Sequence, residues 1–124
     1  MLDAIAHIAL VVKDPARTAV LFEQLFSSRV VERLDEEGHA ETFVQLGRTW
    51  FVLAKADIER PRSGDHIAFA VKKSDLPAYA EKLSRLGVEF FLAREDTSLY
   101  FFDYDNHVFE LDSTDFESGL THAV

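Results

Sequence analysis

Apolar positions along this chain follow first the period of a strand and then the period of a helix. The run HIALVVKD, which begins at His7, is apolar and rich in β-branched residues, as strands are. After it, Asp14 and Pro15 stand where a helix cap and a first helical turn are expected. The apolar positions that follow at helical spacing are Leu21, Phe22 and Leu25. This stretch predicts a strand followed by a helix.

The same order of elements returns in the second half of the chain. The run HIAFAVKK begins at His66, Ser74 is placed to cap a helix, and Gly87 is placed to end it. The apolar positions between them are Leu76, Tyr79, Ala80, Leu83 and Leu86. Two nearly identical octapeptides that both start with histidine and both precede a helix indicate an internal duplication.

Each predicted helix is followed by three short runs of β-branched and aromatic residues. The runs are RVVERL, ETFVQL and TWFVLAK in the first half and VEFFLA, SLYFFDYD and HVFELD in the second. Each half therefore has the order β-α-β-β-β, with a helix on only one face of its sheet. We predict an α+β fold in which paired βαβββ modules, about residues 1–58 and 59–124 of one domain, form a curved mixed sheet around a cleft.

Composition limits the classes of partner. The 124 residues, 48% of them hydrophobic, suit one domain. The formal net charge of −9 repels phosphate backbones and anionic lipids, so we expect neither nucleic acid nor a membrane as a partner. The absence of cysteine excludes disulfides and thiolate nucleophiles. No signal-peptide features begin the sequence and no apolar run approaches the roughly 20 residues of a membrane span, so a cytoplasmic protein is expected.

The repeated histidines predict a metal site. His7 and His66 start equivalent strands, so a pseudo-twofold axis would bring their imidazoles together around one ion. Glu110 is the best third ligand because it lies within an apolar strand, where an unpaired carboxylate is costly to bury. By strand alternation its side chain faces away from Phe109 and Leu111. Two imidazoles and one carboxylate with an open coordination position are typical of catalytic metal sites.

The duplication also indicates where a fourth ligand would lie. Aligning WFVL with VFEL places Val52 opposite Glu110, and valine cannot bind a metal. The alternative for any one of these histidines is an ordinary core or surface residue, since a single histidine at a strand start is more often that than a ligand. Three further histidines have no support as ligands and are expected to be solvated, namely His39, His107 and His122.

The segment DYDNH has two interpretations. Asp103, Asp105 and Asn106 resemble oxygen ligands for a hard cation, but a tight hairpin turn uses the same residue types. The turn is the simpler interpretation.

The segments HIALVVKD, DHIAFAV and LYFFDYDNHVFEL resemble the vicinal-oxygen-chelate superfamily, and within it most closely the fosfomycin-resistance enzymes of the epoxide-hydrolase type. The resemblance runs from about Leu2 to Leu120. It implies paired βαβββ modules, a homodimer in which modules of two chains combine around each metal, and a small-molecule substrate. It places the metal ligands on His7, His66 and Glu110, with Mn²⁺ as the favoured ion and Zn, Ni or Fe as alternatives.

The resemblance also implies roles for residues outside the metal triad. It makes Glu41 the general base that activates water while the metal polarises an oxirane, although a solvated strand residue would look the same in sequence. Its substrate-binding positions fall on aromatic and polar residues, namely Phe43, Trp50, Ser98 and Tyr100.

Several positions depart from the family pattern. A threonine that contacts the oxirane is Ala9 here, a tyrosine before the second histidine is Gly64, and the arginine that holds the phosphonate is Gly119. The family's glycine-containing loop reads AREDTS. A lost arginine removes bidentate anion recognition, so another arginine must supply the charge, and Arg94, Arg62 and Arg48 are the candidates.

Two other functions stay open at this point. One is a lyase, isomerase or thiol transferase that uses the same metal ligands with a different base. The other is a metal-free binding protein like the bleomycin-resistance proteins, against which the presence of His7, His66 and Glu110 weighs.

Overall fold

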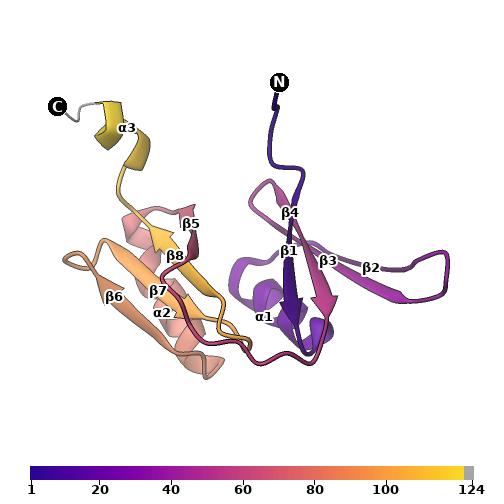
Figure 1. Cartoon of the computed structure of the whole chain (residues 1–124). Coiled ribbons are helices and arrows are strands. Elements are labelled where there is room, and N and C mark those ends of the chain that lie inside the picture. The colour runs from indigo at the N-terminus through magenta and orange to yellow at the C-terminus, as the bar shows by residue number, and fades with distance from the viewer. Residues whose placement is uncertain (122–124) are drawn as a thin grey trace. The chain divides into compact units, whose positions relative to one another are not determined.

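The computed structural model describes residues 1–121 and consists of two compact units, Met1–Arg60 and Pro61–Val124, which are described separately (Figure 1). His122, expected to be solvated, lies outside the described residues. No helix within residues 1–121 has the length and apolar character needed to cross a membrane.

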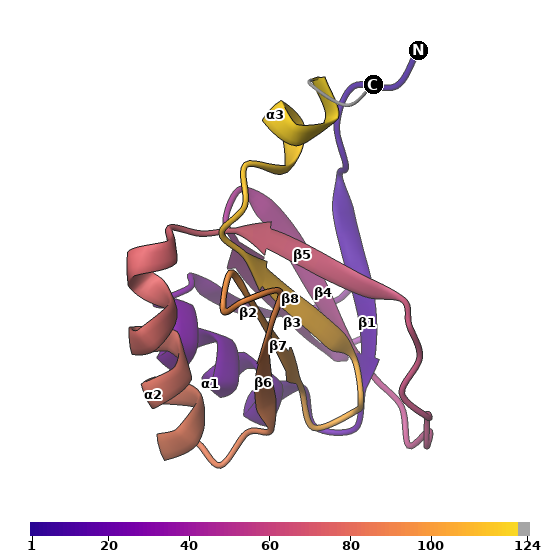
Figure 2. The same cartoon turned by 90° about the vertical axis from the view of Figure 1, so that its left-hand side faces the viewer.

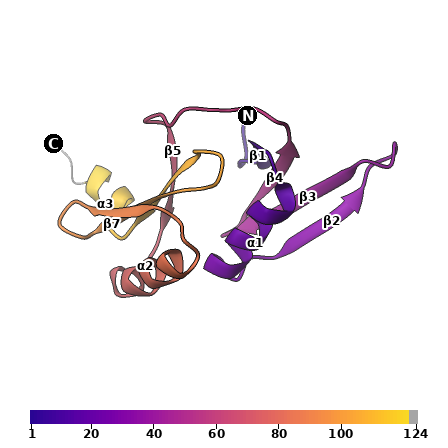
Figure 3. The same ribbon diagram turned by 90° about the horizontal axis from the view of Figure 1, so that it is seen from below.

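The first unit is one β-α-β-β-β module. Its elements are β1 (His7–Val12), α1 (Pro15–Phe26), β2 (Val30–Leu34), β3 (Ala40–Leu46) and β4 (Thr49–Lys55). The sheet has the order β1-β4-β3-β2, with β1 parallel to β4 and the other pairs antiparallel. The predicted cap is confirmed, because Asp14 Oδ1 accepts a hydrogen bond from the backbone N–H of Arg17 at 3.1 Å. α1 packs against β3 and β4 (Figure 3), and Phe22, Val44 and Phe51 are fully buried.

The second unit repeats the module. Its elements are β5 (His66–Ala70), the 3-10 turn η1 (Lys73–Asp75), α2 (Leu76–Arg85), β6 (Phe90–Ala93), β7 (Ser98–Phe102), β8 (Val108–Asp112) and a further short helix, α3 (Phe116–Thr121). The sheet order is β5-β8-β7-β6, with only β5 and β8 parallel. α2 packs on one face of this sheet, and α3 follows the end of β8 (Figure 2). The predicted α+β class with paired βαβββ modules is confirmed.

The strand registers of the two units agree. Ala9 is paired with Val52 in the first unit, and Ala68 is paired with Glu110 in the second. Val52 is therefore the structural counterpart of Glu110, as the duplication predicted.

One predicted cap is wrong. Ser74 does not cap α2, because Lys73–Asp75 forms a 3-10 turn and the helix begins only at Leu76, with Pro77 in its first turn. The predicted end of this helix is confirmed. Gly87 has a φ of +69°, in the left-handed region that favours glycine, and the N–H of Val88 donates to the carbonyl of Leu83 at 3.0 Å.

Candidate functional site

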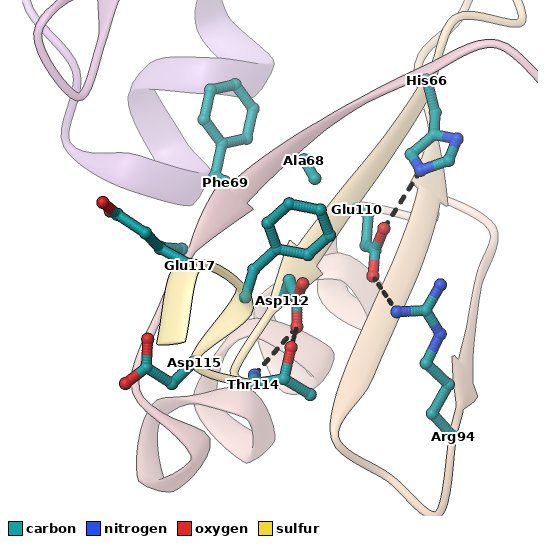
Figure 4. A pocket seen from close by; sticks show the side chains of 11 residues that line it. His66, Ala68, Phe69, Arg94, Glu110, Asp112, Thr114, Asp115 and Glu117 are labelled. Atoms are coloured by element: carbon teal, nitrogen blue, oxygen red, sulfur yellow. Dashed lines mark hydrogen bonds and ion pairs between the residues drawn. The ribbon is translucent and has the colours of Figure 1, made fainter. Parts of the chain in front are cut away.

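A cavity of about 700 Å³ lies in the second unit, beside β5 and β8. Its walls come from β5, β8, the turn after β6, and the segment that leads into α3 (Figure 4). The titratable residues that line it are His66, Arg94, Glu110, Asp112, Asp115 and Glu117. The predicted alternation along β8 agrees with the structure, since Glu110 lines the cavity whereas its buried neighbours Phe109 and Leu111 do not.

His66 and Glu110 form the centre of the cavity wall. His66 Nε2 lies 3.1 Å from Glu110 Oε1, and His66 Nδ1 lies 2.9 Å from the carbonyl oxygen of Gly64. A carbonyl can only accept, so Nδ1 carries the proton and Nε2 is the nitrogen directed at the carboxylate. Glu110 is buried, with only 3% of its side chain exposed. Gly64, a departure from the family pattern, thus contributes its carbonyl to the orientation of His66.

This pair has the donor chemistry of a metal site. With Nδ1 protonated, the lone pair of a neutral Nε2 would face a carboxylate oxygen at 3.1 Å, which is repulsive unless a second proton or a cation is shared between them. Glu110 Oε2 is buried and has no hydrogen-bond partner among residues 1–121. A buried carboxylate oxygen without a hydrogen-bond partner, beside an oriented imidazole, fits a divalent cation.

Tyr100 and Ser98 lie on the same sheet face as Glu110. The ring of Tyr100 meets that of His66 edge to face, with centroids 5.5 Å apart, and stacks on Phe91. Burial, and then the negative charge of Glu110, raise the pKa of the Tyr100 hydroxyl above its ordinary value. Ser98 is fully buried, and its Oγ has no hydrogen-bond partner in the described part of the chain.

Arg94 reaches the cavity from an unusual turn. Arg94, Glu95 and Asp96 have φ values of +53°, +56° and +62°. This is the left-handed backbone conformation, which residues other than glycine rarely adopt. The N–H and hydroxyl of Thr97 both donate to the Arg94 carbonyl, at 3.2 and 2.7 Å. This is the loop in which the sequence departs from the family's glycines. Arg94 Nη1 lies 3.7 Å from Glu110 Oε2.

The other two candidate arginines are placed elsewhere. Arg62 donates to Glu89 at 2.6 Å and to Asn106 at 3.2 Å, and its guanidinium lies over the ring of Phe102 at 3.7 Å. Arg48 lies in the turn between β3 and β4 of the first unit. Of the three, only Arg94 lines the cavity.

The first unit carries the remaining predicted residues on one sheet face. His7 is exposed at the start of β1, and its register partner is Trp50. Phe43 and Trp50 line a shallow pocket of about 220 Å³ together with Val31 and Arg33. Glu41, two residues before Phe43 on β3, faces the same way.

Arg33 is a residue that sequence reasoning missed. Its Nε lies 3.3 Å from Glu41 Oε1, and its guanidinium lies over the ring of Phe43 at 4.9 Å. Arg33 and Glu41 are direct partners in the β2–β3 register. Opposite charges at matched positions of the hairpin were the signal that would have found this pair.

The structure thus brings His66, Glu110, Arg94 and Tyr100 together in the second unit, and Glu41, Phe43 and Trp50 on one face of the first. Within either unit, the described residues hold no cluster of three metal-binding side chains. His7 as the third ligand stays a prediction.

The histidines other than His7 and His66 differ in their exposure to solvent. His39 is exposed, as predicted. The prediction for His107 is wrong, because its side chain is only 10% exposed and its Nδ1 lies 2.7 Å from Oδ2 of the fully buried Asp103 carboxylate. Asp103 Oδ1 accepts the N–H groups of Asp105 and His107 at 2.9 and 2.8 Å, which agrees with the hairpin-turn interpretation of DYDNH.

Both units have the same β-α-β-β-β framework with a histidine at the start of the first strand, and the chain matches the model of a known superfamily. The model of the glyoxalase/bleomycin resistance protein/dioxygenase superfamily matches residues 4–111, and the chain belongs to this superfamily.

Within this superfamily, the chain is similar to fosfomycin resistance proteins. The chain is 30% identical to the fosfomycin resistance protein FosX of Listeria innocua over 97% of this chain and 96% of that protein. It is 33% identical to FosX of Mesorhizobium japonicum over 90% and 86% of the two chains. Among solved structures, it is similar to a mutant of Listeria monocytogenes FosX complexed with Mn(II) and 1S,2S-dihydroxypropylphosphonic acid, with a TM-score of 0.85, 30% identity, and coverage of 97% and 99%.

Proposed function

We propose that this protein is a divalent-metal-dependent enzyme that adds water to the oxirane of fosfomycin or a closely similar epoxide. The observation that carries the proposal is the oriented His66–Glu110 pair, in which Gly64 holds Nδ1 and leaves Nε2 directed at a buried carboxylate. The FosX relatives support the substrate class. The ligand of the similar FosX structure is a vicinal diol phosphonate, the type of product expected when water opens an epoxypropyl phosphonate.

The metal ligands in this proposal are His66 and Glu110 from the second unit and His7 from the first. Mn²⁺ is the favoured ion, because the similar FosX structure contains Mn(II), while Zn, Ni and Fe stay alternatives. When bound, the ion would supply a Lewis acid for the oxirane oxygen. The chain's own part is to orient the imidazole of His66 through the Gly64 carbonyl and to keep Glu110 away from water.

Glu41 is the proposed general base. Its carboxylate takes a proton from water as the water oxygen forms a bond to an oxirane carbon and the C–O bond of the ring breaks; the ring oxygen then takes up a proton from solvent, and Glu41 returns its proton to solvent. The Arg33 guanidinium, 3.3 Å from Glu41 Oε1, limits the orientations of the carboxylate. Phe43 and Trp50 offer apolar surface on the same face for the carbon end of the substrate.

The phosphonate is proposed to bind in the second unit. The Tyr100 hydroxyl is protonated at neutral pH, and its raised pKa keeps it so in more basic solution, so it is able to donate to an anion; the Ser98 hydroxyl lies on the same face. Gly119 stands where the family has an arginine for the phosphonate, and Arg94 is proposed to supply the positive charge instead. A homodimer and a cytoplasmic location stay predictions from the sequence.

The test is phosphorus NMR of fosfomycin incubated with Mn²⁺-loaded protein, with and without an added thiol. Formation of the diol without thiol is the expected result. A thiol adduct alone would instead indicate a transferase, and neither product at high enzyme concentration would eliminate the proposal. Glu41→Gln should lower the rate by about 10²- to 10⁴-fold and leave Mn²⁺ binding unchanged. Glu32→Gln, an exposed acid on the neighbouring strand β2, is the matched control.

A further inference from the structure

Glu110 is shared between the predicted metal site and the guanidinium of Arg94. We infer that Arg94 is a metal-released anion receptor: it pairs with Glu110 in the absence of metal, and it becomes available to the substrate's anionic group when Glu110 binds the ion. Metal and anion would then bind cooperatively through one side chain. The inference rests on the proposed function, since it takes Glu110 to be a metal ligand.

The pair between Arg94 and Glu110 is loose enough to open. Its separation of 3.7 Å exceeds that of a hydrogen bond, and Glu110 Oε2 has no hydrogen-bond partner among residues 1–121. The Arg94 side chain is 56% exposed, whereas that of Glu110 is 3% exposed. An ion pair with one solvated partner contributes little, so the guanidinium can leave Glu110 at small cost while the carboxylate stays in place.

The charges around the cavity explain why this release matters. Besides Glu110, its walls include Asp112, Asp115 and Glu117 (Figure 4), and among the lining residues that the structure describes Arg94 alone has a permanent positive charge. Without a cation on Glu110, the carboxylates repel an anionic ligand and Arg94 is partly neutralised by its neighbour. A divalent ion on Glu110 cancels that carboxylate and frees the guanidinium, so the local charge becomes favourable to an anion.

The backbone holds Arg94 at this place. Arg94 is the first of the consecutive left-handed residues of the turn, and both bonds from Thr97 fix its carbonyl. Such a conformation is costly for a residue with a side chain and persists only where the surrounding structure imposes it. The backbone of Arg94 is therefore held in place at the rim of the cavity. Its long side chain can turn so that the guanidinium lies either beside Glu110 or within the cavity.

Two effects of opposite sign follow from this arrangement. Because Arg94 competes with the ion for Glu110, removing its charge should tighten metal binding when no anion is present. Because Arg94 also binds the anion, its removal should abolish most of the tightening that an anion produces. By linkage, the factor by which the anion tightens metal binding equals the factor by which the metal tightens anion binding.

The experiment is an electron paramagnetic resonance titration of metal-stripped protein with Mn²⁺, with and without saturating methylphosphonate. In the natural protein, methylphosphonate should tighten Mn²⁺ binding by about tenfold. Arg94→Gln should bind Mn²⁺ alone about threefold more tightly than the natural protein and show at most about a twofold effect of methylphosphonate. Arg94→Lys, which keeps the charge but not the planar fork, should retain part of the effect. Arg85→Gln, an exposed arginine paired with Glu81 on α2 of the same unit, is the matched control and should behave like the natural protein.

Each other result overturns the inference in a distinguishable way. If Arg94→Gln keeps the full tenfold effect, the anion binds the metal without Arg94. If Arg94→Gln weakens Mn²⁺ binding in the absence of methylphosphonate, Arg94 is not a competitor of the ion. If the natural protein binds no Mn²⁺, the proposed metal site fails and the inference fails with it, whereas the first two results leave the metal site intact.

Discussion

The two units have the same framework and different side chains on the sheet face opposite the helix. Following the strand registers, Val52 of the first unit corresponds to Glu110 of the second, and Phe43 corresponds to Tyr100. Where the second unit has a carboxylate beside its histidine, the first has an apolar side chain. The duplicated backbone therefore places equivalent side chains on the same sheet face in both units. The residue types at these positions decide that the second unit, and not the first, provides the carboxylate and the tyrosine hydroxyl.

The largest effect is expected where the units differ most, at Glu110. Glu110→Gln removes a predicted metal ligand and the charge that faces His66 Nε2. Mn²⁺ binding should weaken by more than about a hundredfold, because the loss of a residue that only hydrogen-bonds to a metal ligand already lowers metal affinity by about 10- to 100-fold. Paramagnetic resonance titration measures this, and phosphorus NMR should show loss of diol formation. Binding equal to that of the natural protein would remove Glu110 from the ligand set.

The turns that join the last two strands of each unit offer a second contrast. The first unit turns at Gly47, with a φ of +60°, whereas the second uses the buried Asp103 to hold two backbone N–H groups and the ring of His107. Asp103→Ala leaves these donors without a partner and should lower the free energy of unfolding by about 2 kcal/mol. Urea denaturation measures the loss, and Asp103→Asn, which keeps an acceptor oxygen, should lose less. An unchanged midpoint for Asp103→Ala would show that the buried pair adds no stability.

Making the units more alike should also alter the site. Val52→Glu places a carboxylate in the first unit at the position that Glu110 has in the second. If it fills the open coordination position, Mn²⁺ binding should be at least as tight as in the natural protein while epoxide opening falls by about tenfold, since a closed metal site is typical of a structural role. Val52→Leu is the control for side-chain size. Full activity in Val52→Glu would show that Val52 lies away from the ion.

The smallest effect concerns the β2–β3 and β6–β7 turns. The first unit has a glycine there, Gly38, with a φ of +84°, whereas Glu95 adopts a φ of +56° in the second unit without being glycine. Glu95→Gly should relieve strain and raise the free energy of unfolding by about 0.5 kcal/mol after the entropic cost of glycine is subtracted. Glu36→Gly, at a position where φ is not positive, should be destabilising. Thermal unfolding compares the two, and equal losses would contradict the assignment of strain.

Much of the fold and part of the site were predictable from local patterns. The Asp14 cap, the Gly87 terminator, the order of helices and strands along each half and the burial of Glu110 between two core residues all depend on neighbours close in sequence or on strand alternation. Ser74 failed as a cap because a 3-10 turn intervened. The place of His107 beside a turn predicts a solvated ring, but its burial depends on the contact with the buried Asp103 carboxylate that the folded turn creates.

Local order in this protein follows from the chain itself: apolar periods define strands and helices, and the repeated octapeptide identifies the duplication and the histidines. The tertiary structure was needed for contacts between segments far apart in sequence. It selected Arg94 over Arg62 and Arg48 as the cation of the cavity, and it brought the Gly64 carbonyl and the Glu110 carboxylate to the two nitrogens of His66. The physical reason is that backbone hydrogen bonding and periodicity act over a few residues, whereas the partners of a long charged side chain depend on which strands and turns pack beside it.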